Sequence, residues 1–232
     1  MPDSADFSNG LSADVIAYYD ALASCYDEDR FGNSYGAFIH AQECRWLRRV
    51  LPVGGQVLDL GCGTGRMLDL TTHGVDGSEA MLAQARARHP GKVLARGDVT
   101  AVPWGDETFD AIFCLHVLMH LPPVVAQAAF AEAWRLLRPG RLLAFDAPSA
   151  ARRRLLGYRT SGWHGATAYS RAGLRAMLPG WTPVGDRGVL FLPHRLPAGL
   201  RPACLGLDTA LCASPLRSLA SYRLWTFGKP NR

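Results

Sequence analysis

Short segments rich in apolar residues alternate along this chain with longer segments whose apolar residues recur at helical spacing. The short segments are predicted to be β-strands and cover residues 56–60, 73–76, 92–95, 109–115 and 141–146. The fourth segment is almost continuously apolar, which is typical of a parallel strand covered on both faces. Strands separated by helical segments predict an α/β fold with a doubly wound, mostly parallel sheet and helices on both faces.

The helical segments have recognisable beginnings. Helices are predicted at residues 11–29, 35–51, 78–89, 122–137 and 170–178. Within residues 35–51 the apolar side chains recur on one helical face, as expected of a helix that packs on a sheet. Ser78 is a suitable N-cap, and Pro122 and Pro123 suit the first turn of the helix that they open.

The last third of the chain follows a different pattern. Two further strands are expected at residues 188–192 and 222–227, and the Pro-rich residues 193–217 form an insertion before the last strand. We interpret this insertion as a lid over a bound substrate. The alternatives are a dimer surface, which would make the protein a homodimer, and an amphipathic patch that faces a membrane.

Composition narrows the class of protein. The 232 residues are 48% hydrophobic, which suits one large globular domain, and no apolar run approaches the ~18 residues of a transmembrane helix. The first ten residues have neither the basic start nor the apolar stretch of a secretory signal. The six cysteines lack metal-ligand spacing, so we expect reduced core cysteines, no metal and a cytoplasmic protein.

The charge is unevenly distributed. Residues 1–149 hold 12 basic and 18 acidic residues, whereas residues 150–232 hold 13 basic and 2 acidic residues. The net charge of +5 therefore arises in the last third, where Arg152, Arg153 and Arg154 are consecutive. A solvated face, an anionic acceptor and nucleic acid are the three interpretations of this triplet.

A glycine-rich loop carries the sharpest chemical signal. Gly61, Gly63 and Gly65 directly follow the first strand, so the backbone can turn tightly and approach a ligand. The spacing is GxGxG, and Arg66 stands where a dinucleotide fingerprint has its third glycine. Asp59, two residues before the loop, adds a carboxylate. This combination suits S-adenosylmethionine, which has an amino group, a ribose and an adenine but no pyrophosphate.

Five motifs in sequence order resemble those of the class I, seven-stranded S-adenosylmethionine-dependent methyltransferases, in particular their small-molecule branch. They are VLDLGCGTGR at 57–66, GVDGSEAML at 74–82, GDVTAVPW at 97–104, FDAIFCLHVLMHL at 109–121 and LLRPGRLLAFD at 136–146. Upstream, YDALASCYDEDR at 19–30 is similar to the N-terminal lid helix of the family. The resemblance implies a single domain over residues 1–232. Its parts are a helical lid at 1–52, a cofactor-binding core at 53–149 and an acceptor-side region at 150–232.

The resemblance also implies roles for individual residues. Asp76, beside Gly77, would bind the ribose hydroxyls, and Asp98 would face the adenine amino group with Val99 beside it. Asp59 would hold the methionine amine or stiffen the loop. The lid residue Tyr26, the three loop glycines and Leu115 after the fourth strand complete the expected cofactor site. For each carboxylate the alternative is a turn-capping role.

One departure from the family pattern concerns spacing. Asp59 and Asp76 are closer in sequence than is usual in the family. The helix after the glycine loop must therefore be short, about two turns.

The methyl acceptor is a small molecule in this interpretation, either aromatic or anionic. His116, just past the fourth strand, is either a base or acceptor-orienting group, or a partly buried hydrogen-bonded histidine. His120 is expected to pack structurally, and His164 is a candidate contact to the substrate. Near it, Tyr158, Trp163 and Tyr169 form an aromatic wall or cover the sheet.

Three functions remain to be compared. The first is methyl transfer to an oxygen, nitrogen or carbon atom of a small molecule, in natural product biosynthesis or quinone modification. The second is methylation of RNA, such as tRNA, or of DNA. Neither the Asn/Asp-Pro-Pro-aromatic tetrad of base methylation nor an appended RNA-binding module is present, so nucleic acid is disfavoured. The third is a cofactor-binding protein without methyl-transfer activity.

Overall fold

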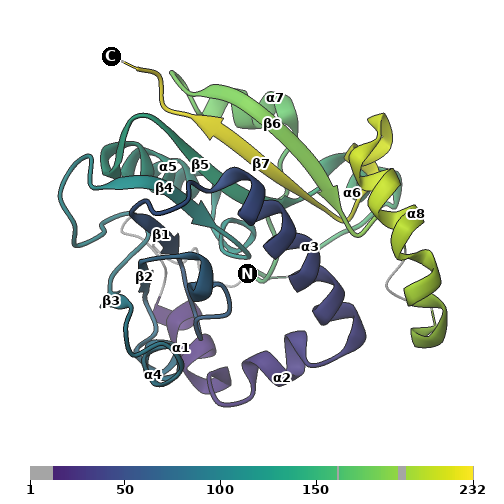
Figure 1. Ribbon diagram of the computed structural model, residues 1–232. Helices are drawn as coiled ribbons and strands as arrows, with labels where there is room; N and C mark the ends of the chain where they lie inside the picture. Colours follow the sequence, from purple (N-terminus) through teal and green to yellow (C-terminus); the bar gives the residue numbers. More distant parts are fainter. Residues whose placement is uncertain (1–12, 161, 193–196, 232) are drawn as a thin grey trace.

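The computed structural model describes residues 13–160, 162–192 and 197–231 (Figure 1). Seven strands form one sheet: β1 (Val57–Leu60), β2 (His73–Asp76), β3 (Val93–Arg96), β4 (Phe109–Cys114), β5 (Leu137–Pro148), β6 (Thr182–Val189) and β7 (Tyr222–Gly228). Their order in the sheet is β3-β2-β1-β4-β5-β7-β6. The pairs among β1 to β5 are parallel, and β7 is antiparallel to both β5 and β6. The expected doubly wound, mostly parallel, seven-stranded sheet is confirmed.

The strand order reverses between β1 and β4. After β1 the chain adds β2 and β3 outward on one side, and it then returns to place β4 on the other side of β1. In open α/β sheets a crevice forms beyond the carboxyl ends of the strands at such a reversal, and ligands bind there. The glycine loop follows β1 and His116 follows β4, so both lie at this crevice.

Helices cover both faces of the sheet (Figure 1). They are α1 (Ala13–Leu22), α2 (Tyr26–Phe31), α3 (Ser34–Val50), α4 (Glu79–Arg88), α5 (Pro123–Leu136), α6 (Ala150–Leu155), α7 (Arg171–Met177) and α8 (Arg201–Ala213), with 3₁₀ turns η1 (Leu68–Leu70), η2 (Leu118–His120), η3 (Ala198–Leu200) and η4 (Pro215–Leu219). On one face, Leu47 of α3 packs with Val57 and Phe113 of the sheet. On the other, α5 and α7 pack with the alternate strand residues, such as Leu58 and Ile112.

The N-terminal segment differs from its prediction. Residues 11 and 12 of the predicted helix lie outside the described residues, and the remainder is split into α1 and α2. Asp27, Glu28 and Asp29, which looked like the acidic end of one helix, form the first turn of α2. Acidic side chains are favoured there because the N-terminus of a helix carries partial positive charge. The short helix expected after the glycine loop is reduced to the single 3₁₀ turn η1.

Two strands have different bounds from those predicted. β5 begins at Leu137, before Pro139 and Gly140. The strand tolerates these two residues because its register with β4 is irregular there and because Gly140 N donates a hydrogen bond to Lys229 O. β6 begins at Thr182 rather than 188, since an edge strand can be exposed and tolerate Pro183. It ends at Val189 because Leu190 has a positive φ of 58°.

The segment at 193–217 is more regular than expected. Residues 193–196 lie outside the described residues, and the rest forms η3, α8 and part of η4. Asp208 of α8 is buried and accepts hydrogen bonds from Gln42 Nε2 of α3 at 3.1 Å and from Leu192 N at 2.8 Å. These bonds anchor α8 against the end of the sheet that carries β6 (Figure 1).

Candidate active site

The glycine loop folds back onto the end of β2. The N–H groups of Gly61 and Cys62 donate to the carbonyl oxygen of Val75 at 2.8 and 2.9 Å. Gly63 N donates to Asp76 Oδ2 at 2.8 Å, so the loop and the acidic strand end form one unit. Gly61 has a φ of +85° and Gly63 a φ of +53°, values that glycine adopts without a steric penalty.

Space as well as conformation requires glycine in the loop. A Cβ at Gly61 would lie 2.4 Å from Val117 Cγ2, and a Cβ at Gly65 would lie 2.9 Å from Leu68 Cδ1. A Cβ at Gly63 would meet no atom within 4 Å, because this residue borders an open pocket. Gly61 and Gly63 therefore leave a cradle for a ligand, whereas Gly65 packs against the protein.

This first pocket has an empty volume of about 650 Å³. Eight of the residues predicted to bind the cofactor or to act in catalysis line it: Tyr26, Gly61, Gly63, Asp76, Gly77, Val99, Leu115 and His116. Its other walls come from α1, from Ser78 and Met81 at the start of α4, and from Val117 and His120. The size is within the ~300–1,000 Å³ typical of small-molecule sites. Residues far apart in the sequence thus converge on one ligand-sized space.

Asp76 organises the floor of this pocket. Besides the bond from Gly63, its Oδ1 accepts from Ser78 N at 2.9 Å. Burial raises the pKa of Asp76, and the hydrogen bonds from Ser78 and Gly63 partly oppose that shift. Each carboxylate oxygen keeps a further acceptor position, so Asp76 can bind two vicinal hydroxyls while holding the loop.

The other two predicted carboxylates do not line the pocket. Asp98 Oδ1 accepts from Thr100 N at 2.8 Å and from Thr100 Oγ1 at 2.6 Å, which is the turn-capping alternative. The neighbouring Val99 supplies the pocket wall instead. Asp59 is buried within β1, and this burial raises its pKa to about 8.

The N-terminal helices close over the crevice. Thr64 Oγ1 of the glycine loop donates to Asp27 Oδ1 of α2 at 2.8 Å, and Asp27 also pairs with Arg88 of α4. Asp20 of α1 accepts from the hydroxyl of Ser78. These bonds tie α1 and α2 to the loop and to α4, so Tyr26 lies at the pocket.

A second pocket adjoins the first. Both are lined by Tyr19, Tyr26, His116 and His120, and the second also by His164. Its empty volume is about 880 Å³. Of the proposed aromatic wall, Tyr158 lines it, whereas Tyr169 is buried in the core beneath α5 and α7. No described residue of 197–217 lines either pocket, so the lid interpretation of the insertion finds no support there.

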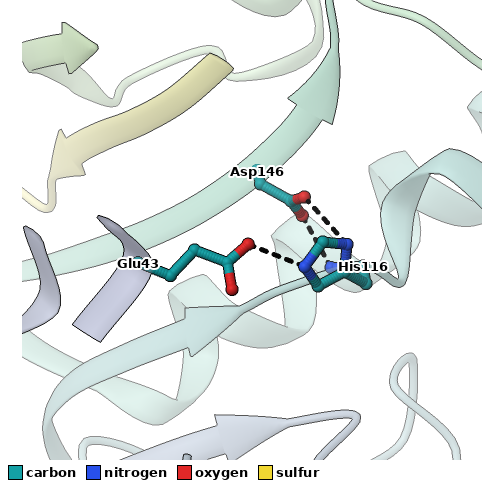
Figure 2. A group of neighbouring side chains, drawn as sticks. All are labelled: Glu43, His116 and Asp146. Atoms are coloured by element: carbon teal, nitrogen blue, oxygen red, sulfur yellow. Dashed lines mark hydrogen bonds and ion pairs between the residues drawn. The ribbon is translucent and has the colours of Figure 1, made fainter. Parts of the chain in front are cut away.

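His116 lies between two buried carboxylates, as Figure 2 shows. Its Nε2 is 2.7 Å from Glu43 Oε1, and its Nδ1 is 3.5 Å from Asp146 Oδ2. The backbone N–H of His116 donates to Asp146 Oδ1 at 2.6 Å, which fixes the unusual φ of +60° at this residue. Arg66 Nη1 pairs with the second oxygen of Glu43 at 2.8 Å.

The charges of Glu43, His116 and Arg66 stabilise one another, whereas burial raises the pKa of Asp146. Burial alone would lower the pKa of His116, but Glu43 and Asp146 raise it above the ordinary 6.5. Burial likewise opposes ionisation of Glu43, yet the charges of His116 and Arg66 lower its pKa to about 2. The two carboxylates therefore favour the protonated ring of His116, which Glu43 holds by a hydrogen bond at Nε2, while Asp146 lies 3.5 Å from Nδ1. This arrangement favours an orienting or hydrogen-bonded histidine over a general base.

The same cluster has donor atoms close enough together to hold a metal ion. Its geometry fits an ion pair better. The imidazole ring stands between the two carboxylates, and the Arg66 guanidinium already neutralises Glu43. A cation would have to displace the 2.7 Å contact between His116 and Glu43.

His120 does more than pack in the core. Gly165 N donates to its Nδ1 at 2.9 Å, so the remaining ring proton lies on Nε2 and is donated to Tyr19 Oη at 3.0 Å. Burial lowers the pKa of His120 to about 3, with His164 and His116 adding to the shift. The hydroxyl proton of Tyr19 is then free to be donated toward the two pockets that this residue lines.

Sequence reasoning missed Glu43, Asp146 and Tyr19. The sequence does contain a signal for Glu43, because residues 39, 46 and 47 define a buried helical face that also includes positions 42 and 43. A glutamine and a glutamate inside an apolar stripe indicate buried polar partners. Those partners, Asp208 and His116, lie far away in sequence and only the fold identifies them.

Known proteins resemble the chain in sequence and in fold. Residues 58–145 match a methyltransferase domain model. The demethylmenaquinone methyltransferase of Beutenbergia cavernae is 33% identical over 138 residues, which cover 55% of each protein. The chain thus spans about half the length of the curated relatives it matches.

Two solved structures share the fold. An S-adenosylmethionine-dependent methyltransferase from Thermotoga maritima has a TM-score of 0.67 and 19% identity, covering 92% of this chain and 99% of its own. The [4+2]-cyclase SpnF has a TM-score of 0.66 and 20% identity, covering 94% and 96%. Among the described residues, no helix is long and apolar enough to cross a membrane. Residues 58–145 therefore form a methyltransferase domain, and the sequence motifs and sheet topology of the chain are those of the class I S-adenosylmethionine-dependent methyltransferase fold.

Proposed function

We propose that the chain transfers the methyl group of S-adenosylmethionine to a small aromatic acceptor bound in the second pocket. The observation that carries this proposal is the continuity of the two pockets through Tyr19, Tyr26, His116 and His120. A cofactor in the first pocket and an acceptor in the second would meet at these residues. In this proposal residues 53–149 bind the cofactor and residues 150–232 complete the acceptor side.

The residues of the first pocket fit the cofactor. Gly61 and Gly63 leave room for the methionine part, and Asp76 offers two acceptor oxygens to the ribose hydroxyls. Val99 and Met81 are buried apolar walls that suit a purine ring. Asp59 lies one strand residue from the loop, where it would support the methionine ammonium or the loop itself. When bound, the cofactor supplies an electrophilic methyl group on a sulfonium.

The chain's own contribution is alignment. Methyl transfer needs the acceptor nucleophile and the methyl carbon to lie in line. Holding two reactants in such a geometry can lower the activation barrier by several kcal/mol, about 7–11 at the upper end. His116 is fixed by Glu43 at its ring and by Asp146 at its backbone N–H, and Tyr19 is fixed by His120. Both are rigid groups at the junction where that alignment would be set. The closed α1 and α2 would keep water from the junction.

The metabolic setting that we propose is natural product biosynthesis. The relatives named demethylmenaquinone methyltransferase make quinone modification the competing setting. In either setting, an aromatic acceptor would agree with the tyrosine-rich lining of the second pocket.

A turnover assay with a panel of acceptors tests the proposal. The protein is incubated with S-adenosylmethionine and phenols, aromatic acids, amines or quinols, and both S-adenosylhomocysteine and the methylated product are measured by mass spectrometry. We expect both products with at least one aromatic acceptor. Cofactor binding without turnover on the whole panel would favour the non-methylating function, which the fold also permits, as the cyclase shows. Turnover only on tRNA would favour nucleic acid.

A further inference from the structure

The three consecutive arginines of α6 have three different environments. Arg152 Nη1 donates to the carbonyl oxygens of Phe191 at 2.9 Å and Leu219 at 2.7 Å, so it is a structural clamp. Arg154 is exposed. Arg153 is half-buried and lines the second pocket. Because the three guanidinium groups have different partners, they do not form one exposed basic surface of the kind that binds the phosphates of a nucleic acid.

Arg153 is held in place without a counter-ion. Its Nη1 and Nη2 donate to the carbonyl oxygens of Ala166 at 3.0 Å and Gly165 at 2.7 Å, and its guanidinium lies 5.1 Å from the ring centroid of Tyr158. It forms no ion pair with any described residue. Two of its five N–H donors are used, and three remain.

The rest of the second pocket has the same character. Aromatic rings line it on several sides: Tyr19, Tyr26, Phe31, Tyr35, Tyr158 and Tyr222. Among the described residues, no aspartate or glutamate lines it. Arg30 adds a second guanidinium to the lining, and the His116 ring that also lines it is hydrogen-bonded to Glu43. A half-buried guanidinium that lacks a protein anion gains from a ligand that brings one.

We infer that Arg153 is the specificity-determining residue of the acceptor pocket and that the acceptor is an aromatic carboxylate, its ring among the tyrosines and its carboxylate on the guanidinium. This inference rests on the proposed function, because it names the class of acceptor for that site. A planar guanidinium with several free donors matches a carboxylate in two-pronged geometry. The arrangement leaves the methyl-accepting atom on the ring or on a second substituent of the acceptor.

A binding experiment with matched probes tests the inference. Wild-type protein and the variants Arg153→Gln, Arg153→Lys and Arg154→Gln are titrated by calorimetry with 2-naphthoate and with its neutral isostere 2-naphthamide. Each titration is run with and without S-adenosylhomocysteine. We expect wild type to bind the acid at least about tenfold more tightly than the amide, since hydrogen bonds between charged groups are worth that much or more.

The variants separate a specific role from a structural one. Arg153→Gln should remove the preference for the acid but leave the affinity for the amide unchanged, which a collapsed pocket would not do. Arg153→Lys should retain part of the preference, and Arg154→Gln should behave as wild type. The inference would be overturned by equal affinity of wild type for the two probes, by no binding of either, or by equal losses in Arg153→Gln and Arg154→Gln. Failure of S-adenosylhomocysteine to bind wild type would instead count against the proposed function, and the titrations without it still test Arg153.

Discussion

Replacing Glu43 by Gln keeps the shape of the side chain and removes the charge that joins His116 to Arg66. The Glu43 side chain is 2% exposed, and its two oxygens lie 2.7 Å from His116 Nε2 and 2.8 Å from Arg66 Nη1. Removing one partner of a buried ion pair costs about 3–5 kcal/mol because the remaining charges stay buried. For a chain of 232 residues, about 2 °C of melting temperature corresponds to 1 kcal/mol, so the expected decrease is about 6–10 °C.

The effect of Glu43→Gln should depend on pH. The pKa of His116 is raised from 6.5, so its stabilising contribution is complete below pH 6.5 and is lost as the pH rises through the folded pKa. The pKa of Glu43 falls from 4.5 to about 2, so its contribution is present above pH 4.5 and is lost as the pH falls toward 2. The difference between wild type and variant should therefore be largest between pH 4.5 and 6.5.

Scanning calorimetry of both proteins across this pH range measures the difference. The matched control is Glu79→Gln, which removes an exposed ion pair with Arg86 and should shift the melting temperature by less than about 2 °C. A decrease no larger than that of the control, or one that does not vary with pH, would refute the assigned charges of the cluster.

Three further predictions concern the cofactor pocket. Gly61→Ala should lower the melting temperature by more than about 2 °C and weaken binding of S-adenosylhomocysteine, because the left-handed φ costs an alanine ~1–2 kcal/mol and its Cβ would clash with Val117. The control is Gly206→Ala on α8, where a Cβ meets no atom within 4 Å, and equal effects of the two variants in calorimetry would contradict the loop geometry. Asp27→Ala should speed dissociation of S-adenosylhomocysteine about 3- to 10-fold in stopped-flow measurements, because the hydrogen bond between Asp27 and Thr64 holds α2 closed. The control Glu28→Ala, at an exposed residue, should leave the rate unchanged, and an unchanged rate in Asp27→Ala would argue against a closed lid. Cofactor affinity should rise as the pH passes about 8, where the buried Asp59 ionises behind the glycine loop and its charge attracts the methionine ammonium. The rise should vanish in Asp59→Asn, and parallel pH profiles of the two proteins would show that the charge of Asp59 does not reach the ammonium.

The sequence predicts best what neighbouring residues determine. The loop from Gly61 to Gly65, the strand that ends at Asp76 and the Ser78 cap are all local features, and the structure has each of them. The split between α1 and α2 was less accessible, because the acidic run suits either a solvated helix end or a helix start. In the structure the acidic run starts a helix, and Asp27 contacts Thr64 of the glycine loop and Arg88 of α4.

What the sequence could not provide is the pairing of distant side chains. From the sequence, His116 was either a base or orienting group or a hydrogen-bonded histidine, because its neighbours Glu43 and Asp146 are far away in the chain. The basic last third was ambiguous for the same reason. Arg171, Arg217 and Arg223 all pair with Asp186, whose side chain is 2% exposed, so these three charges serve the structure.

Calorimetric titration of S-adenosylhomocysteine into wild type and into Asp76→Ala tests the central claim most directly. Asp76 connects the glycine loop to the pocket floor, and its loss removes several charge-assisted hydrogen bonds. We predict one binding site in wild type, an affinity at least about 100-fold weaker in Asp76→Ala, and wild-type affinity in Asp69→Ala, whose side chain is 86% exposed. No binding to wild type, or equal affinity in Asp76→Ala, would contradict the assignment of this pocket to the cofactor.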